Sequence, residues 1–178
     1  LVESTGISEP MPVAETFTFE DEDGESLGNV AELDTMVTVV DAANFLKDFG
    51  SWDDLNDRNM GLSDEDERNI VDLLVDQVEF ANVIIVNKTD LVSQEQVDLI
   101  KKIISQLNSS ALVLESTKSR VSLDKILGTG KFKLDEAQDL SSDWLAIPRG
   151  EEETETEEYG ISNFLFRSDR PFHPQRIW

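Results

Sequence analysis

The sequence predicts an α/β fold in which a parallel sheet is covered on both faces by helices. Short, continuous apolar runs alternate along the chain with segments of helical period. Such runs are typical of strands that are buried on both faces in a parallel sheet. The apolar share of 39% is enough for a packed core, and 178 residues suggest one domain, or one domain and part of another.

The strands are predicted from runs rich in β-branched residues. These runs cover residues 35–41 (TMVTVVD), 82–86 (NVIIV) and, more briefly, 111–114. Leu1 and Val2 have the composition of the tail of a further buried strand.

The helices are predicted from their caps and from apolar spacing. Pro10 suits the first turn of a short helix that ends near residue 16. Asp41 is predicted to cap the next helix, although it could instead line a site; Ser63 caps a third, and Ser93 forms a capping box with Gln96. These and a final short helix are expected over residues 42–49, 63–80, 93–107 and 121–127.

Composition excludes several classes of function. The chain has no cysteine, so these residues hold no disulfide, thiol nucleophile or cysteine-based zinc site. The net charge is −23 and no cluster of Lys and Arg is present, so we expect no nucleic-acid partner. The apolar runs are too short to span a bilayer, and no leader opens the chain, so we expect no membrane partner and a cytoplasmic location.

Acidic residues gather in runs at 20–23, 64–67 and 151–158. A divalent-cation site is one interpretation; solvated loops and helix N-termini are the favoured one, because carboxylates complement the helix dipole. The only histidine, His173, lies between Pro171 and Pro174, where a structural turn is favoured over metal binding. Both ends of the chain have the composition of interrupted elements, so we expect a piece of a longer protein.

The carboxyl ends of the predicted strands are where a ligand should bind. Directly after Val86 come Asn87, Lys88 and Asp90, in the order NKTD. An Asp carboxylate can accept hydrogen bonds from N1–H and N2–H₂ of guanine, a donor pair that adenine lacks. The Asn can tie neighbouring loops together, and the Lys stem can lie on the purine face. A polar turn before the next helix is the alternative.

Two further turns follow predicted strands. Ser116 and Thr117 could offer backbone N–H groups to the guanine O6, although such residues are common in ordinary turns. Glu3 is followed three residues later by Gly6. Glu3 could hold a Mg²⁺-bound water or orient the attacking water, and Gly6 could let a backbone N–H approach a γ-phosphate. A turn with a helix cap explains the second pattern equally well.

Together these residues resemble the CobW-like family of metal-trafficking GTPases, which are P-loop nucleotide hydrolases. The resemblance is to the zinc-limitation-linked bacterial members in particular. It rests on the Glu-x-x-Gly loop at 3–10, the helix at 66–68 and 74–81, the guanine motif at 87–91, and the segments 158–164 and 170–174. It implies a partial P-loop GTPase fold over 1–128, an acidic linker over 129–158 and the start of a C-terminal α+β domain over 159–178.

The resemblance also implies a function. The whole protein would be a GTP-hydrolysing metallochaperone that uses GTP and Mg²⁺ and delivers Zn²⁺ to a metal-dependent client protein. The family's Gly-x-x-Gly-x-Gly-Lys-[Ser/Thr] loop and Cys-x-Cys-Cys motif are not in these residues and are expected before Leu1, so the 178 residues alone are expected to be inactive. Three alternatives are a cobalt-handling GTPase of cobalamin synthesis or nitrile hydratase activation, a GTPase serving a protein machine, and a non-catalytic acidic interaction module.

Overall fold

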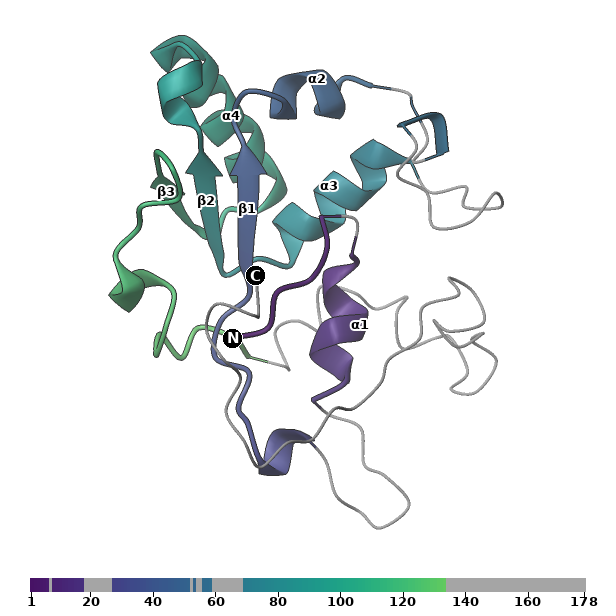
Figure 1. Ribbon diagram of the computed structural model, residues 1–178, viewed down its shortest axis with the longest axis vertical. Helices are drawn as coiled ribbons and strands as arrows, with labels where there is room; N and C mark the ends of the chain where they lie inside the picture. Colours follow the sequence, from purple (N-terminus) through teal and green to yellow (C-terminus); the bar gives the residue numbers. More distant parts are fainter. Residues whose placement is uncertain (7, 18–26, 52, 54–55, 59–68, 134–178) are drawn as a thin grey trace, which may run out of the picture. The chain divides into compact units, whose positions relative to one another are not determined.

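Three parallel strands form the centre of the structure, a computed structural model (Figure 1). They are β1 (Val37–Asp41), β2 (Val83–Asn87) and β3 (Leu112–Glu115), and they pair in the order β1-β2-β3. Each lies within or beside one of the predicted runs, so the α/β class and the parallel sheet are confirmed. The register sets Asp41 beside Asn87.

The structure describes residues 1–6, 8–17, 27–51, 53, 56–58 and 69–133. The three acidic runs, His173 and the segment 159–178 lie outside these ranges. Of the predicted linker at 129–158, only residues 129–133 are described.

The helices are α1 (Pro10–Glu15), α2 (Phe45–Phe49), α3 (Ile70–Glu79) and α4 (Gln94–Leu107). Short 3₁₀ turns occur at Leu27–Asn29 (η1), Asn56–Arg58 (η2), Thr89–Leu91 (η3) and Leu123–Lys125 (η4). The predicted capping box of α4 is present: Gln96 N donates to Ser93 Oγ, and Ser93 N donates to Gln96 Oε1. The predicted short helix that begins at Pro10 is also confirmed.

The bounds of the predicted helices differ from those of the structure. Ser63, the predicted cap of the third helix, lies outside the described residues. The helix α3 begins at Ile70, where the Asn69 side chain accepts from Asp72 N at 2.8 Å and caps it. The second begins at Phe45 after Asn44, not after Asp41, which accepts a hydrogen bond from Ala43 N within the preceding turn. Residues 121–127 form only the single turn η4, since their apolar residues span too few turns to bury a helix face.

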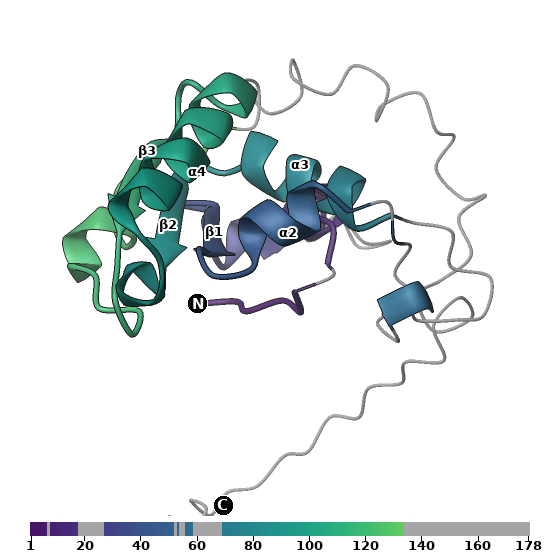
Figure 2. The same ribbon diagram turned by 90° about the horizontal axis from the view of Figure 1, so that it is seen from above.

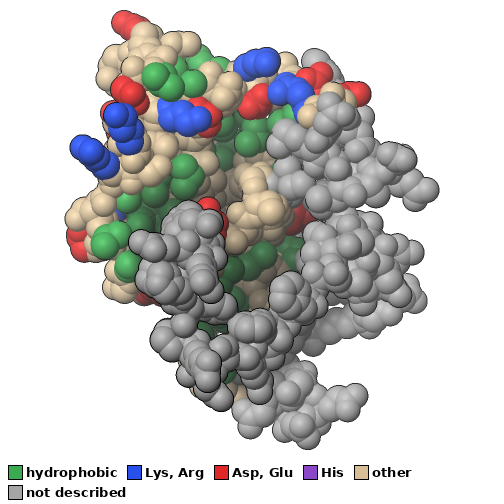
Figure 3. Space-filling view, in the orientation of Figure 1, with side chains coloured by type: hydrophobic (Ala, Val, Ile, Leu, Met, Phe, Trp, Pro, Cys, Tyr) green, Lys and Arg blue, Asp and Glu red, His purple; other side chains and the backbone are tan. Residues whose placement is uncertain are grey.

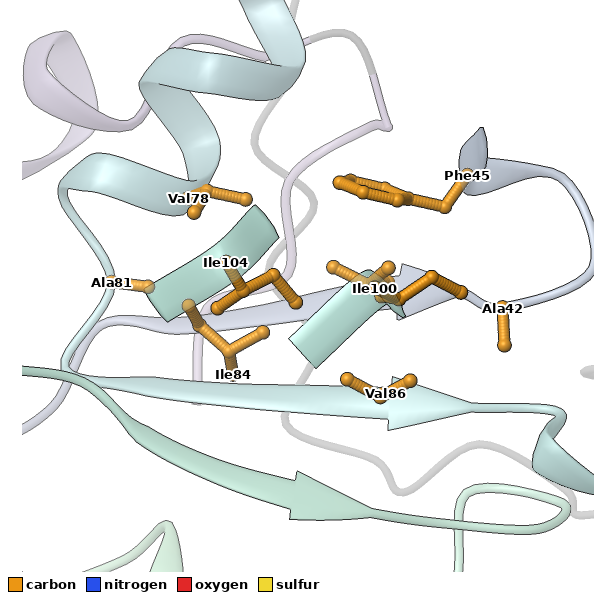
Figure 4. Close-up of a cluster of buried hydrophobic side chains, with 9 residues drawn as sticks. Ala42, Phe45, Val78, Ala81, Ile84, Val86, Ile100 and Ile104 are labelled. Carbon is orange, nitrogen blue, oxygen red and sulfur yellow. The ribbon is translucent and has the colours of Figure 1, made fainter. Parts of the chain in front are cut away.

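The main core lies between one face of the sheet and helices α2, α3 and α4. Ile84 and Val86 of β2 are fully buried there against Ile100 and Ile104 of α4 (Figure 4). The rest of this cluster comes from β1, the turn after it, α2 and the end of α3, namely Val40, Ala42, Phe45, Val78 and Ala81. Asn108 supports the same region, because its side-chain amide donates to the carbonyls of Val78, Glu79 and Ala81.

The opposite face of β1 departs from the prediction of a sheet covered on both sides. Val37 and Val39 point away from the core cluster and keep 38% and 58% of their surface exposed. Leu1 and Val2 are exposed and irregular, so the predicted strand tail there is wrong. Two residues provide too few ladder hydrogen bonds to hold a strand without a paired neighbour.

The chain after η4 returns to the amino end of β1. The Asp34 carboxylate accepts hydrogen bonds from Thr129 N and Gly130 N, at 3.0 and 2.7 Å. Gly130 has a φ of +58°, a left-handed conformation that favours glycine. Asp34 lies three residues before β1 begins, so this contact holds residues 129–130 near the amino end of that strand. Asp41 is at the opposite end.

Candidate functional site

The loops after β2 and β3 bring most of the predicted site residues together. Asn87 ends β2, and Lys88, Thr89 and Asp90 follow it; Ser116 and Thr117 follow β3. Because β2 and β3 are adjacent and parallel, both loops leave the same edge of the sheet. The structure therefore brings these residues to one edge of the sheet, and the contacts below define how they meet.

Asn87 joins the two loops. Its side chain is buried, Ser119 N donates to its Oδ1 at 2.9 Å, and its Nδ2 donates to Ser119 Oγ at 2.9 Å. The predicted loop-tying role of Asn87 thus has a named partner. Ser119 was missed by sequence reasoning, and no local signal marks it, since it lies 32 residues away along the chain.

Thr89 and Ser116 form a second link between the loops. Thr89 N and Thr89 Oγ1 both donate to the Ser116 carbonyl, at 3.2 and 3.1 Å. Ser116 is buried and its own N–H already donates to Val86 O at 2.8 Å, as part of the sheet. Of the backbone N–H groups of Ser116 and Thr117, that of Thr117 has no acceptor among the described residues. It is therefore available to donate to a ligand.

Lys88 reaches across to the neighbouring strand. Its Nζ lies 2.7 Å from Asp41 Oδ2, and its backbone is left-handed with a φ of 62°. Burial raises the pKa of Asp41, but hydrogen bonds from Lys88, Asn44 and Ala43 N outweigh burial and hold that pKa below its ordinary value. Asp41 therefore stays ionised at neutral pH, and it lies at the edge of the sheet, the alternative that the sequence left open beside the favoured role of a helix cap.

Asp90 differs from its neighbours because its carboxylate is exposed and has no hydrogen bond or ion pair with any described residue. It lies in the turn η3, next to the anchored Thr89. Because the turn holds its backbone and no described residue pairs with it, the Asp90 carboxylate can accept two hydrogen bonds from a ligand without first breaking a bond within the protein.

Backbone strain is concentrated in these two loops. Among the described residues, the non-glycine residues with a positive φ are Lys88, Lys118 and Ser119, at 62°, 54° and 54°. Each such conformation is costly for a residue with a Cβ, and strained residues of this kind cluster at binding sites. The hydrogen bonds of Asn87 with Ser119 and of Thr89 with Ser116 hold the two loops in these conformations.

Glu3 and Gly6 lie apart from this cluster in their contacts. Gln77 of α3 donates to Gly6 O at 3.0 Å and to Ser8 O at 3.1 Å, which ties the first loop to that helix. Glu3 is exposed, and in the described residues no hydrogen bond joins it to the loops after β2 and β3. A Cβ built on Gly6 would meet no atom within 4 Å, so nothing within the described chain requires glycine there.

The surface around the site is mixed in charge despite the strong net negative charge. On the face shown in Figure 3, Lys and Arg side chains gather over the upper part of the molecule, toward which the strands of Figure 1 point. Among the described residues, no three His, Cys, Asp or Glu side chains are placed to share a metal ion. In the same ranges no helix combines the length and apolarity needed to cross a membrane.

Comparison with known proteins gives a family match and several relatives. Residues 1–115 match the family model described as CobW/HypB/UreG, nucleotide-binding domain. The zinc-regulated GTPase metalloprotein activator 1 of Dictyostelium discoideum is 49% identical over 178 residues, which is 99% of this chain and 37% of that protein. No solved structure matches the chain.

Two more distant relatives have related names. The zinc-regulated GTPase metalloprotein activator 1 of Schizosaccharomyces pombe is 31% identical over 68% of this chain and 24% of its own length. The zinc chaperone CobW of a Sinorhizobium species is 28% identical over 73% of this chain and 36% of its own length. The chain thus spans between about a quarter and just over a third of the relatives it matches.

Proposed function

Because the chain belongs to the CobW/HypB/UreG family of nucleotide-binding domains, we propose that it is part of a GTP-hydrolysing metallochaperone that delivers zinc to client proteins. The names of the relatives support this, since two are called zinc-regulated GTPase metalloprotein activators and one a zinc chaperone. The family match spans the predicted hydrolysis loop and the guanine motif.

The observation that carries the proposal is the unpaired Asp90 carboxylate at the end of a fully buried strand. In this proposal Asp90 accepts the N1–H and N2–H₂ donors of guanine, and Thr117 N–H donates to O6. The Lys88 stem lies on the purine face, and Asn87 holds the two loops together through Ser119. Ser116 contributes by anchoring Thr89. Each role uses a group that the contacts leave available or hold in place.

Hydrolysis is assigned to residues at the start of the chain. Glu3 orients the attacking water or a water on Mg²⁺, and Gly6 admits the γ-phosphate next to its backbone. Bound Mg²⁺ would neutralise charge that develops on the β- and γ-phosphates. The 178 residues contain neither a Gly-x-x-Gly-x-Gly-Lys-[Ser/Thr] loop nor any cysteine. We therefore assign the phosphate cradle and the zinc ligands to the rest of the protein, and expect these residues alone to be inactive.

The domain organisation follows the same proposal. Residues 1–128 belong to the GTPase domain, 129–158 form an acidic linker, and 159–178 begin the C-terminal domain. The first residues of this linker contact the GTPase domain, since Thr129 N and Gly130 N donate to the Asp34 carboxylate.

The test is the substitution Asp90→Asn in the whole protein. An Asn amide donates where the carboxylate accepted, so it repels the guanine donors and suits xanthine, which has a carbonyl at C2. We expect GDP affinity to fall at least about 100-fold and XDP affinity to rise, because a site that loses its hydrogen-bond match rejects the ligand strongly. Asp98→Asn, an exposed carboxylate on α4, is the matched control and should change neither affinity. Unchanged guanine preference in Asp90→Asn would refute the assignment.

The metal part of the proposal needs its own measurement. Zinc bound to the purified whole protein should change between the GTP-loaded and GDP-loaded states, as read by mass spectrometry of metal content. Metal content that ignores the nucleotide would contradict the chaperone role and favour a GTPase with another kind of client. Cobalt in place of zinc would favour the cobalt-handling alternative.

A further inference from the structure

Asp41 and Lys88 form a link between neighbouring strands at the site. Asp41 ends β1, Lys88 directly follows β2, and the register puts Asp41 beside Asn87. The Lys88 side chain spans from one strand end to the other, with its Nζ 2.7 Å from Asp41 Oδ2. Its four-carbon stem therefore lies across the edge from which the guanine motif emerges.

The Asp41 carboxylate is itself held in place. Ala43 N donates to its Oδ1 at 2.9 Å, and Asn44 Nδ2 donates to its Oδ2 at 2.8 Å. Lys88 Nζ is the third donor to this carboxylate. Two of these donors belong to the turn that directly follows Asp41. They hold the carboxylate in place, so that it can pair with Lys88 in one position.

We propose that Asp41 is a positioning residue for nucleotide binding, which holds the Lys88 stem in place as a ready surface for the purine ring. This inference rests on the proposed function, because it takes the ligand at this edge to be a purine nucleotide. Asp41 touches no base itself; it acts through Lys88. Asp90 remains the residue that distinguishes guanine from adenine.

A stabilising role alone does not explain the pair. The side chains of Lys88 and Asp41 keep 47% and 31% of their surface exposed, and ion pairs of such exposure contribute little to folding. Lysine has many rotamers, and a ligand that must order a free lysine loses affinity through the lost side-chain entropy. Fixing the stem in advance removes this loss, which is the usual advantage of a preorganised site.

The same strand offers a matched control. Asp34 precedes the other end of β1, and it too accepts hydrogen bonds from backbone N–H groups. The variants Asp41→Asn and Asp34→Asn thus make the same chemical change at opposite ends of one strand. Asparagine at position 41 can still accept from Ala43 N, so the turn after β1 is retained.

The experiment measures GDP and GTP dissociation constants and kcat in the whole protein, with the melting temperature as the folding readout. We expect Asp41→Asn to raise both dissociation constants about 3- to 10-fold, a loss typical of giving up side-chain preorganisation. The preference for guanine over adenine and kcat at saturating GTP should stay unchanged. Asp34→Asn should bind both nucleotides as the unsubstituted protein does.

A double substitution separates positioning from a purely structural role. Lys88→Met keeps an apolar stem but cannot pair with Asp41. If Asp41 acts through Lys88, adding Asp41→Asn to Lys88→Met weakens binding no further. Should Asp41→Asn fail to fold, Asp41→Glu keeps the charge but displaces the carboxylate by one methylene, and it should raise the dissociation constants similarly.

The outcomes distinguish this inference from the function on which it rests. Wild-type affinity in Asp41→Asn or Asp41→Glu, or fully additive effects in the double variant, would overturn the positioning role while Asp90 still governed guanine preference. If the unsubstituted protein bound no guanine nucleotide, or Asp90→Asn kept its preference, the proposed function would fail first, and the positioning role with it.

Discussion

The side-chain amide of Asn87 makes two hydrogen bonds with Ser119, which lies in the next loop. Ser119 N donates to Asn87 Oδ1 and Asn87 Nδ2 donates to Ser119 Oγ, both at 2.9 Å. Asn87 is only 8% exposed, while Ser119 is exposed. The residue that opens the NKTD segment thus links the loops after β2 and β3.

Asn87→Ala should weaken both folding and guanine binding. It removes both hydrogen bonds to Ser119, each of which contributes about 0.5–1.5 kcal/mol to the free energy of unfolding. GDP affinity should fall as well, because the two loops lose their link. Urea unfolding and GDP titration measure the two effects.

Ser119→Gly is the control for that prediction. It keeps the N–H donor and places glycine at a φ of 54°, where glycine is unstrained. Relief of strain should offset the lost hydroxyl, so stability should change by less than about 0.5 kcal/mol. Equal losses in Asn87→Ala and Ser119→Gly would show that the hydroxyl, not the backbone link, matters.

Asn108→Ala should destabilise the fold without changing nucleotide preference. The buried Asn108 side chain donates to three carbonyls around the end of α3 and accepts from Ser110 N and Ala111 N. Removing it leaves several buried groups unpaired, so we expect a loss of about 2–4 kcal/mol. The exposed neighbour Ser109→Ala is the comparison and should be close to neutral. A loss below about 1 kcal/mol in Asn108→Ala would mean that water replaces the side chain.

Glu3→Gln tests the hydrolytic assignment in the whole protein. If Glu3 orients the attacking water, kcat for GTP should fall about 100-fold or more, the range for losing a positioned acid–base group. GDP affinity should hardly change, because Glu3 has no contact with the guanine loops among the described residues. Glu32→Gln, another exposed carboxylate, should leave kcat unchanged. A Glu3→Gln protein that hydrolyses GTP at the normal rate would remove Glu3 from the mechanism.

The pH dependence of stability should report the Asp41 carboxylate. Its pKa in the folded protein lies below the ordinary value of 3.8, through hydrogen bonds from Lys88, Asn44 and Ala43 N that outweigh burial. A lowered folded pKa contributes stability that is fully present above 3.8 and is lost as the pH falls through the folded value. The unfolding free energies of the unsubstituted protein and Asp41→Asn should therefore differ most at neutral pH and converge below about pH 4. A difference that does not shrink at all as the pH falls into the acid range would assign it to something other than this charge.

Asp76 should behave in the opposite way. Burial first, and then the nearby carboxylates of Glu9, Glu79 and Asp72, raise the pKa of Asp76 above its ordinary value. A raised carboxyl pKa opposes folding at neutral pH and is relieved as the pH falls. Asp76→Asn should thus stabilise the protein at pH 7, by about 0.5 kcal/mol as for a half-buried substitution, and thermal unfolding measures it. A lower melting temperature would show that Asp76 has a favourable partner.

Much of the fold could be predicted because its signals are local. The capping box of Ser93 and Gln96 is a contact over three residues, so α4 begins where the sequence indicates. The Asn69 cap of α3 was not predicted, because Asn is one of several residue types that cap helices well and the segment before α3 offers more than one of them. Val37 and Val39 have strand composition, yet composition does not reveal whether a neighbour covers their side of the sheet.

The sequence by itself determined the α/β class and the three strands and marked the NKTD segment at 87–90, since each depends on residues within a few positions of one another. Only the tertiary structure decided that Asn87 binds Ser119 and that Lys88 reaches Asp41, across 32 and 47 residues of chain. The physical reason is strand pairing. Parallel register brings the ends of β1, β2 and β3 to one edge, and the side chains that meet there are fixed by that register and not by their spacing along the chain.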